Sequence, residues 1–250
     1  IVDGKQIESE PDQGELTRRY TEKAVSFIKD HSKEPFFLYF AHTFPHIPLY
    51  TNARFAGTSK RGLYGDVVEE IDWSVGEVLK ALRENGLDEN TFVIFTSDNG
   101  PHHEGGADPD FFKSYGPFRG IKRDVYEGGI RIPMVAWCPG TIKAGAQSDH
   151  ISAFWDVMPT LAELTGTVLP EKTDGISFLP TLLSKKDQQA HDYLYWEFHE
   201  LNGREALRSG KWKLIRQPIV GETILELYDL SNDIHAVSYT HLTLPTTSRV

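Results

Sequence analysis

The stretch FVIFTSDNG at residues 92–100 runs from an apolar segment directly into an acid, an amide and a glycine. A simple turn needs only Asn99 and Gly100, so the acid Asp98 calls for a second explanation. In open α/β sheets, ligands bind beyond the carboxyl ends of the strands, and Asp98 and Asn99 follow such an end. Their oxygens suit a hard cation such as Ca²⁺ or Mg²⁺. An ordinary Asx turn is the alternative, and two donors alone cannot fill a calcium shell of about 6–8 oxygens.

Apolar patterns on both sides of this stretch predict alternating helices and strands. The 3.6-residue period predicts helices over residues 12–33, 63–85 and 156–165. Continuous apolar runs predict buried strands at residues 36–41, 91–96 and 132–137, which are typical of a parallel sheet. From about residue 190, short alternating segments separated by Ser-Gly and Gly-Glu turns predict antiparallel strands. The sequence therefore predicts an α/β fold with a mostly parallel, mixed sheet flanked by helices, and a small C-terminal antiparallel subdomain.

We expect three parts along the chain. Residues 1–189 are predicted to belong to the α/β domain and residues 190–236 to the antiparallel subdomain. Residues 237–250 are interpreted as a non-native tail, because the Thr-rich phrase there has no link to LYDLSND. VSYTHL within that tail is also what one frame of a common sequencing adapter encodes; a genuine exposed tail is the alternative. At the other end, IVDGKQIESE has neither an initiator Met nor a leader, so we expect the natural N-terminus to lie upstream.

Composition excludes several classes of protein. The formal net charge is −10, from 36 acids against 26 bases, which argues against a nucleic-acid-binding protein. Any anion site must therefore be made positive locally. Cys138 is the single cysteine, so no internal disulfide can form, and its neighbours offer no base that would make it a nucleophile. No apolar run approaches the roughly 20 residues that a membrane span needs.

Two further stretches carry candidate site residues. FFLYFAHTFPHIP (36–48) places His42 and His46 beyond the predicted strand, and the prolines around His46 restrict its segment. A histidine held there suits a general acid near neutral pH, whereas a loop histidine with a satisfied hydrogen bond is the alternative, favoured for His42. The stretch GPFRGIKRDVYEGGIRIP (116–133) contains a cluster of three bases, Arg119, Lys122 and Arg123, in an otherwise acidic chain. Lys122 suits the neutralisation of an oxyanion, although a solvated basic loop is favoured on spacing alone.

Four motifs taken together carry a resemblance to a known family. They are FVIFTSDNGP, PFFLYFAHTFPHIPL, FRGIKRDVYEGGIRIP and the pair GKWKLIR and ELYDLSND, and they occur in family order up to about residue 233. The chain resembles the type I sulfatases, the formylglycine-dependent arylsulfatase family of the alkaline phosphatase superfamily. That resemblance implies an alkaline-phosphatase-like fold and the hydrolysis of sulfate monoesters. The substrate would be a sulfated small molecule or a sulfated glycan. A periplasmic or secreted location would fit the use of calcium.

The resemblance also implies roles for individual residues. Asp98 and Asn99 would be calcium ligands, His46 would protonate the leaving oxygen, and Lys122 would contact the sulfate. The Cys-x-Pro-Ser-Arg type motif, whose cysteine becomes the formylglycine nucleophile, does not occur in this sequence, and neither does the family's upstream acidic pair. We therefore predict that this polypeptide is inactive alone. His102, His103 and Arg119 are further candidates for binding substrate, with solvated loop residues as the alternative for both histidines.

Two rival functions stay open from the sequence. A phosphomonoester or phosphodiester hydrolase of the same superfamily often carries Asp-His where this chain has Asp98 and Asn99, because it holds zinc or manganese. The all-oxygen pair favours calcium and sulfate. The second rival is a non-catalytic glycan-binding remnant, which the missing nucleophile would permit.

Overall fold

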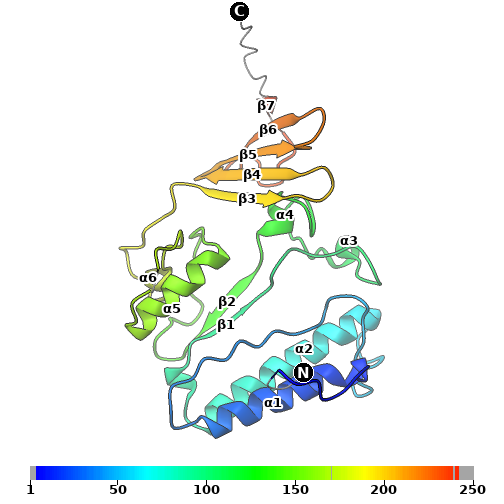
Figure 1. Cartoon of the computed structure of the whole chain (residues 1–250), viewed down its shortest axis with the longest axis vertical. Helices are drawn as coiled ribbons and strands as arrows, with labels where there is room; N and C mark the ends of the chain where they lie inside the picture. The colour runs from blue at the N-terminus through cyan, green and yellow to red at the C-terminus, as the bar shows by residue number, and fades with distance from the viewer. Residues whose placement is uncertain (1–3, 170, 239, 242–250) are drawn as a thin grey trace, which may run out of the picture. The chain divides into compact units, whose positions relative to one another are not determined.

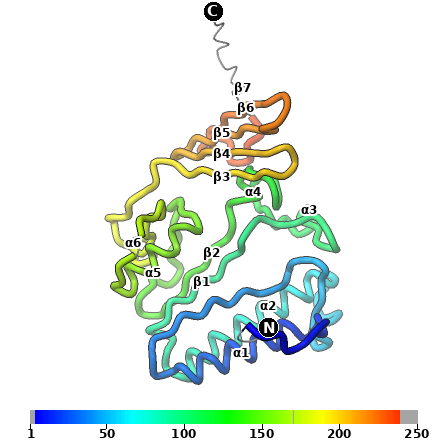
Figure 2. The backbone as a smooth tube through the Cα atoms, in the orientation of Figure 1, coloured from blue at the N-terminus to red at the C-terminus, as the bar shows by residue number. Residues whose placement is uncertain are grey.

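The computed structural model describes residues 4–169, 171–238 and 240–241. The chain divides into two compact units (Figure 1). Unit 1 comprises residues 1–92 and 103–108, and unit 2 comprises residues 93–102 and 109–250. Figure 2 follows the backbone through both units. Each unit contains its own cluster of buried apolar side chains, so each has a core of its own.

Unit 1 is built on two helices that pack against each other, α1 (Leu16–Asp30) and α2 (Gly62–Glu84). Short 3-10 helices, η1 (Gln13–Glu15) and η2 (Asp88–Asn90), lie at the start of α1 and after α2. The apolar stripes predicted for these segments face the contact, where Ile28 and Val67 are each 1% exposed. A hydrogen bond of 2.6 Å between the hydroxyls of Thr21 and Ser74 crosses the same contact. Both predicted helices are confirmed.

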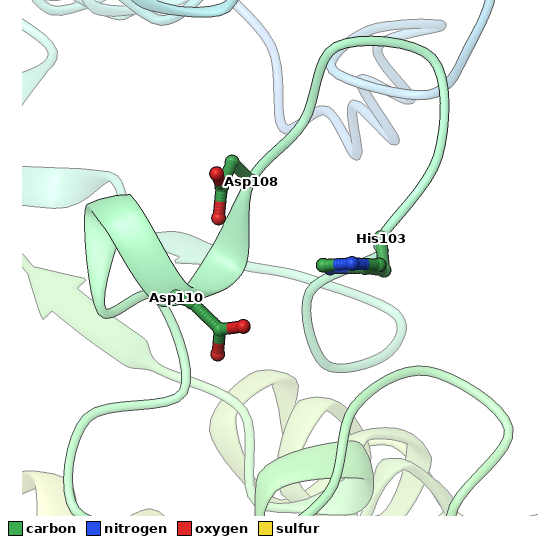
Figure 3. Close-up of side chains that lie close together, drawn as sticks. All are labelled: His103, Asp108 and Asp110. Atoms are coloured by element: carbon green, nitrogen blue, oxygen red, sulfur yellow. The ribbon is translucent and has the colours of Figure 1, made fainter.

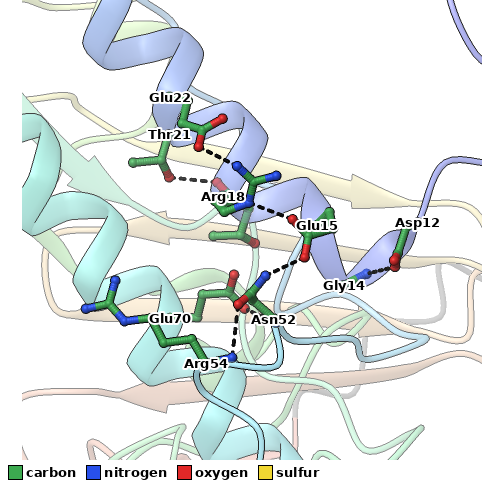
Figure 4. A network of polar contacts seen from close by, with 10 residues as sticks. Asp12, Gly14, Glu15, Arg18, Thr21, Glu22, Asn52, Arg54 and Glu70 are labelled. Carbon is green, nitrogen blue, oxygen red and sulfur yellow. Dashed lines mark hydrogen bonds and ion pairs between the residues drawn. The ribbon is translucent and has the colours of Figure 1, made fainter.

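The loop that follows the histidine segment is fastened to both helices of unit 1 (Figure 4). Glu15, before α1, accepts hydrogen bonds from Asn52 and from Arg18, each at 2.6 Å. Glu70 of α2 is 1% exposed. Its carboxylate accepts hydrogen bonds from the backbone N–H of Asn52 at 2.9 Å and from the Thr51 hydroxyl at 2.8 Å. These partly buried, charge-assisted bonds fix the loop, and with it one end of the segment that carries His46.

The structure of residues 36–41 contradicts one prediction. It is extended, but the described part of the chain pairs it with no strand. Its side chains alternate: Leu38 and Phe40 line a groove beside α1, whereas Phe37 is 70% exposed and Tyr39 is 82% exposed. The expectation of a strand buried on both faces is therefore wrong here, because burial of both faces requires neighbouring strands that the described residues do not supply.

The strands on either side of the Lys122 segment lie in unit 2. β1 (Val93–Thr96) pairs with β2 (Met134–Trp137) antiparallel, with Val93 opposite Trp137 and Thr96 opposite Met134. Both predicted strands exist, but they are shorter than expected, and Phe95 and Val135 are 45% and 61% exposed. The parallel pairing expected for these runs is not what the described residues show. An antiparallel pair brings the end of β1 beside the start of β2, and therefore brings the loops there together.

The helices of unit 2 are short. They are α3 (Pro109–Phe112), α4 (Glu127–Ile130), η3 (Phe154–Asp156), α5 (Val157–Thr165) and α6 (Leu179–Leu182). α5 matches the predicted helix and ends at Gly166, whose φ of +67° is the left-handed conformation that glycine adopts readily. The buried carboxylate of Asp156 holds this region by accepting from the amides of Ala153 and Ile176 and from His191.

The C-terminal part of unit 2 is an antiparallel sheet, as predicted. Its strands are β3 (Leu194–Phe198), β4 (Arg204–Ser209), β5 (Trp212–Gln217), β6 (Ile224–Asp229) and β7 (Thr240–His241), hydrogen-bonded in that order. Ile215 and Tyr228 are fully buried in its core. The mixed α/β fold with a C-terminal antiparallel sheet is therefore confirmed.

The tail interpreted as non-native falls mainly on residues 239 and 242–250, which lie outside the described residues. Residues 240–241 pair with β6 as β7. No helix in the described ranges is both long and apolar enough to span a membrane.

Candidate functional site

The loop after β1 carries the Asp98-Asn99 pair. Asp98 is exposed, and Asn99 is half-buried. The Asn99 side-chain nitrogen donates to the Gly100 carbonyl at 2.8 Å, and the Ser97 hydroxyl donates to the Asn99 carbonyl at 3.1 Å. The Asn99 amide oxygen is an acceptor and therefore a possible ligand atom. The loop thus offers a carboxylate and an amide oxygen side by side, which is donor chemistry for a hard cation.

This loop is joined directly to the segment that carries Lys122. The Gly100 amide donates to the Gly129 carbonyl at 2.8 Å, and the Lys122 amide donates to the Pro101 carbonyl at 2.8 Å. A Cβ atom at Gly100 would lie 2.0 Å from the Gly128 carbonyl oxygen, so only glycine permits this approach. Asp98, Asn99 and Lys122 therefore lie on neighbouring loops of unit 2. The rule for strand ends applies to Asp98 and Asn99 alone, whereas Lys122 precedes β2 and was associated with them only through the family resemblance.

Lys122 occupies a tight turn. The Asp124 amide donates to the Ile121 carbonyl at 2.9 Å, and the Ile121 amide donates back to the Asp124 carboxylate at 3.0 Å. Lys122 and Arg123 are the two central residues, and Arg123 has a φ of +77°. A positive φ at the third position defines a type II-like turn, where Gly or Asn is usual. Lys122 is half-buried and Arg123 is exposed.

The two glycines after Glu127 serve close packing. A Cβ atom at Gly128 would lie 2.1 Å from the Gly120 carbonyl oxygen, and one at Gly129 would lie 2.1 Å from that of Asp124. Neither glycine has a positive φ in the structure, so the close approach, and not the left-handed conformation, explains them. The backbone of residues 119–130 is therefore folded back on itself around the Lys122 turn.

The structure gives Arg119 partners that argue against our interpretation of it as a substrate-binding residue. Its guanidinium donates to the Tyr228 hydroxyl at 3.1 Å and to the Ala236 carbonyl at 3.0 Å. It also lies 4.0 Å from the centre of the Tyr126 ring, a cation–π distance. Arg119 thus fastens the segment to the C-terminal sheet. The cationic cluster seen in the sequence is therefore divided: Arg119 is bound to Tyr228 and Ala236, whereas Lys122 stays a candidate for contacting an anion.

The histidine candidates of unit 1 differ from each other. His46 is exposed, and its Nδ1 lies 2.7 Å from the Ile47 carbonyl oxygen. Because a carbonyl oxygen only accepts, Nδ1 is the donor in this hydrogen bond. His42 was expected to be a hydrogen-bonded loop residue, but neither ring nitrogen has a partner within the described residues. Burial lowers the pKa of His42, so it is neutral near pH 7.

The candidates His102 and His103 follow the Asp98-Asn99 loop. His102 is half-buried in unit 2, and its Nε2 lies 3.4 Å from Nη1 of Arg123. His103 and Asp108 are exposed on the segment that belongs to unit 1, while Asp110 lies on α3 of unit 2 (Figure 3). Exposed acidic groups are common without a metal, so we assign no metal site to them.

Sequence reasoning missed a buried ionic cluster next to the Lys122 segment. Glu127 is 2% exposed and accepts from Lys213 at 2.7 Å and from Arg208 at 2.6 Å. Lys213 is fully buried, and this burial lowers its pKa, with Glu127 opposing the shift. The alternating pattern of β5 gave no sign of it, because a lysine at such a position is normally solvated.

Comparisons with known proteins identify the family of this chain. A family model described as Sulfatase matches residues 3–167, and one described as N-sulphoglucosamine sulphohydrolase, C-terminal, matches residues 116–242. The fold and the paired loops thus define an alkaline-phosphatase-like α/β protein. The chain belongs to the sulfatase family.

Three similar proteins illustrate the match. The chain is 43% identical over 180 residues to mouse N-acetylgalactosamine-6-sulfatase, covering 68% of this chain and 33% of that protein. It is 36% identical over 233 residues to the N-acetylgalactosamine-6-O-sulfatase of Bacteroides thetaiotaomicron, covering 85% of this chain and 45% of that protein. A solved structure, BT33336S-sulf, from work on glycosaminoglycan metabolism by that bacterium, matches with a TM-score of 0.79 and 34% identity over 92% of this chain and 51% of that one. The chain thus spans about a third to a half of these proteins.

Proposed function

We propose that this chain is part of a sulfuric ester hydrolase that cleaves sulfate monoesters on carbohydrates. The observation that carries the proposal is the backbone pairing of two loops, one with hard oxygen donors and one with a lysine. Membership of the sulfatase family supports it. The names of the similar proteins, which are N-acetylgalactosamine sulfatases, support a sulfated glycan as the substrate.

Lys122 supplies positive charge in an otherwise acidic chain. Its backbone amide is bound to Pro101 and its turn is closed by Asp124, so the side chain starts from a fixed point. An ammonium group held there neutralises charge on the oxygens of a bound sulfate as a point charge. Because the group is positioned before the substrate arrives, little reorganisation is needed as charge builds up in the transition state.

The Asp98-Asn99 loop fits a calcium ion as part of its ligand shell. Both donors are oxygens, and the Asp98 carboxylate is exposed. Further ligands must come from residues outside this pair, since calcium takes about 6–8 oxygens. When bound, the ion would stabilise negative charge on the sulfuryl oxygens. Without it, Asp98 would repel a sulfate, so the loop and the cation belong to one site.

His46 is the proposed general acid. The bond from Nδ1 to the Ile47 carbonyl orients the ring, and the proposed role of Nε2 is to pass a proton to the departing alcohol oxygen. His46 belongs to unit 1, and its role is inferred from its motif and its own geometry.

The nucleophile is proposed to lie in a part of the enzyme outside this chain, as a formylglycine. Cys138 does not fit that role, because it is 2% exposed and lies in the sequence WCPG. We therefore expect this polypeptide to be inactive by itself, and to need a region with a Cys-x-Pro-Ser-Arg type motif.

The test compares two ester classes in a longer protein that joins this chain to such a region. We expect the kcat/KM ratio to favour a sugar 6-sulfate over the matching 6-phosphate, and a calcium chelator to abolish the activity. A preference for the phosphate, or activity that requires zinc, would establish the phosphoesterase alternative. Binding of the sulfated sugar without turnover in that longer protein, with its formylglycine verified by mass spectrometry, would establish the glycan-binding alternative.

A further inference from the structure

One face of the C-terminal sheet is turned toward the segment that carries Lys122. Alternate residues of its central strands contact residues 119–127 through polar side chains. The contacts are Arg204 with Asp124, Arg208 and Lys213 with Glu127, Gln217 and Glu226 with Tyr126, and Tyr228 with Arg119. The same face also carries the core residues Ala206 and Ile215, so it combines an apolar centre with polar contacts to one loop.

Arg204, the first residue of β4, contacts the turn that contains Lys122. Its Nη1 donates both to the Asp124 carboxylate and, at 2.9 Å, to the carbonyl of Arg123. The same Asp124 carboxylate accepts from the Ile121 amide through its other oxygen. A single guanidinium therefore holds both the closing residue and the third residue of the turn, and its side chain is only 20% exposed.

The bonds from Arg204 explain how Arg123 keeps a backbone conformation that is unfavourable for an arginine. Arg123 has a φ of +77°, and a residue with a Cβ atom adopts that conformation only when its surroundings hold it there. Arg204 holds the end of the turn through the Arg123 carbonyl and the Asp124 carboxylate. Without these bonds, the positive φ of Arg123 could relax to a negative value by rotation of the peptide between Lys122 and Arg123. Such a relaxation would loosen the bonds that close the turn and change the direction in which the turn presents Lys122.

We propose that Arg204 is a positioning residue for Lys122: it holds the Ile121–Asp124 turn in the conformation that presents the lysine beside the Asp98-Asn99 loop. The role of Lys122 toward sulfate rests on the function proposed above, whereas the ordering of the turn by Arg204 does not. The C-terminal sheet thereby takes part in the site without touching the substrate.

The first experiment uses the chain itself and measures amide hydrogen exchange. Arg204→Ala should speed the exchange of the Ile121 and Asp124 amides at least about tenfold, the value of one typical hydrogen bond. The matched control is Arg216→Ala, which removes a guanidinium paired with Glu205 at 2.5 and 2.7 Å at an exposed site. It should leave these amides unchanged. Equal exchange in Arg204→Ala and the unaltered chain, at equal global stability, would overturn the proposal.

A second substitution separates the turn from general stability. Glycine adopts positive φ without strain, so Arg123→Gly should restore slow exchange in the Arg204→Ala background. Should Arg204→Ala fail to fold, Arg204→Lys keeps the charge and loses the planar two-partner geometry, and it should show the same local effect. Absence of rescue by Arg123→Gly would contradict a role exerted through the turn.

The last experiment uses the longer, active sulfatase. Arg204→Ala should lower kcat for a sulfate ester about tenfold or more with less change in KM, and Arg123→Gly should restore it. A loss of kcat that Arg123→Gly does not restore would contradict the positioning role. If the longer protein proves to have no sulfatase activity, the proposed function fails, while the exchange experiment still decides the ordering of the turn.

Discussion

Replacing Glu127 should harm the protein far more than replacing its partner Lys213. Glu127→Gln removes the one carboxylate that faces both Lys213 and Arg208, and Lys213 is fully buried. Leaving a buried charge without its counter-ion costs about 3–5 kcal/mol. Lys213→Met instead leaves Glu127 paired with Arg208 at 2.6 Å, so the carboxylate stays compensated. The methionine fills most of the lysine volume, and we expect a loss below about 2 kcal/mol.

Urea unfolding of the chain measures this difference. Tryptophan fluorescence suits it, because all tryptophans except Trp73 lie in unit 2 and the Lys213 ammonium lies 5.7 Å from the centre of the Trp196 ring. Lys80→Met on the exposed side of α2 is the control, since its pair with Glu84 is solvated, and it should change the free energy of unfolding by less than about 0.5 kcal/mol. Equal losses for Glu127→Gln and Lys213→Met would refute this reasoning.

The same cluster predicts a pH dependence. Burial lowers the pKa of Lys213 in the folded chain below its ordinary value of 10.5. Between the two pKa values the unfolded state binds more protons, so the free energy of unfolding rises with pH across that window. Lys213→Met lacks this group. As the pH rises toward 10.5, the unaltered chain should therefore gain stability relative to Lys213→Met, and a constant difference would contradict the lowered pKa.

Three further predictions concern the loops. Gly100→Ala should destabilise unit 2 by about 1–3 kcal/mol in urea unfolding, because its Cβ would lie 2.0 Å from the Gly128 carbonyl oxygen. The control is Gly76→Ala on α2, where a Cβ meets nothing within 4 Å, and it should be neutral or stabilising. Equal effects of the two substitutions would contradict the close approach. In the longer enzyme, His46→Ala should slow hydrolysis of sugar sulfates more than that of nitrophenyl sulfate, because only a poor leaving group needs a proton, and equal losses would argue against a general acid. Asp98→Ala should raise the calcium concentration needed for half-maximal activity at least about tenfold, and an unchanged requirement would remove Asp98 from the calcium site.

The sequence predicted those parts of the fold that depend on local pattern. The 3.6-residue period predicts the helices around Ile28 and Val67 and the position of α5. The segment 36–41 was misjudged because a continuous apolar run indicates burial without saying which strands provide it. Its exposed Phe37 and Tyr39 reflect the lack of neighbouring strands in the described part of the chain.

Strand ends indicated only part of the candidate site, because Asp98 and Asn99 follow β1 whereas Lys122 precedes β2. Asp98, Asn99 and Lys122 come together on paired loops because β1 and β2 are neighbours. The partners of Arg119 could not be predicted, because Tyr228 lies 109 residues further along the chain. A basic cluster in a sequence therefore does not reveal which of its members faces solvent and which is bound to a distant strand.

Turnover of a sulfate ester by the longer enzyme with Lys122→Ala tests the central claim most directly. The lysine is half-buried on a turn whose bonds are made by its backbone and by Asp124, so the substitution should leave the unfolding midpoint unchanged. Loss of the ammonium beside the sulfate should lower turnover at least about tenfold. Turnover close to that of the unaltered enzyme, in a variant that folds normally, would show that Lys122 does not contact the sulfate and would contradict the account.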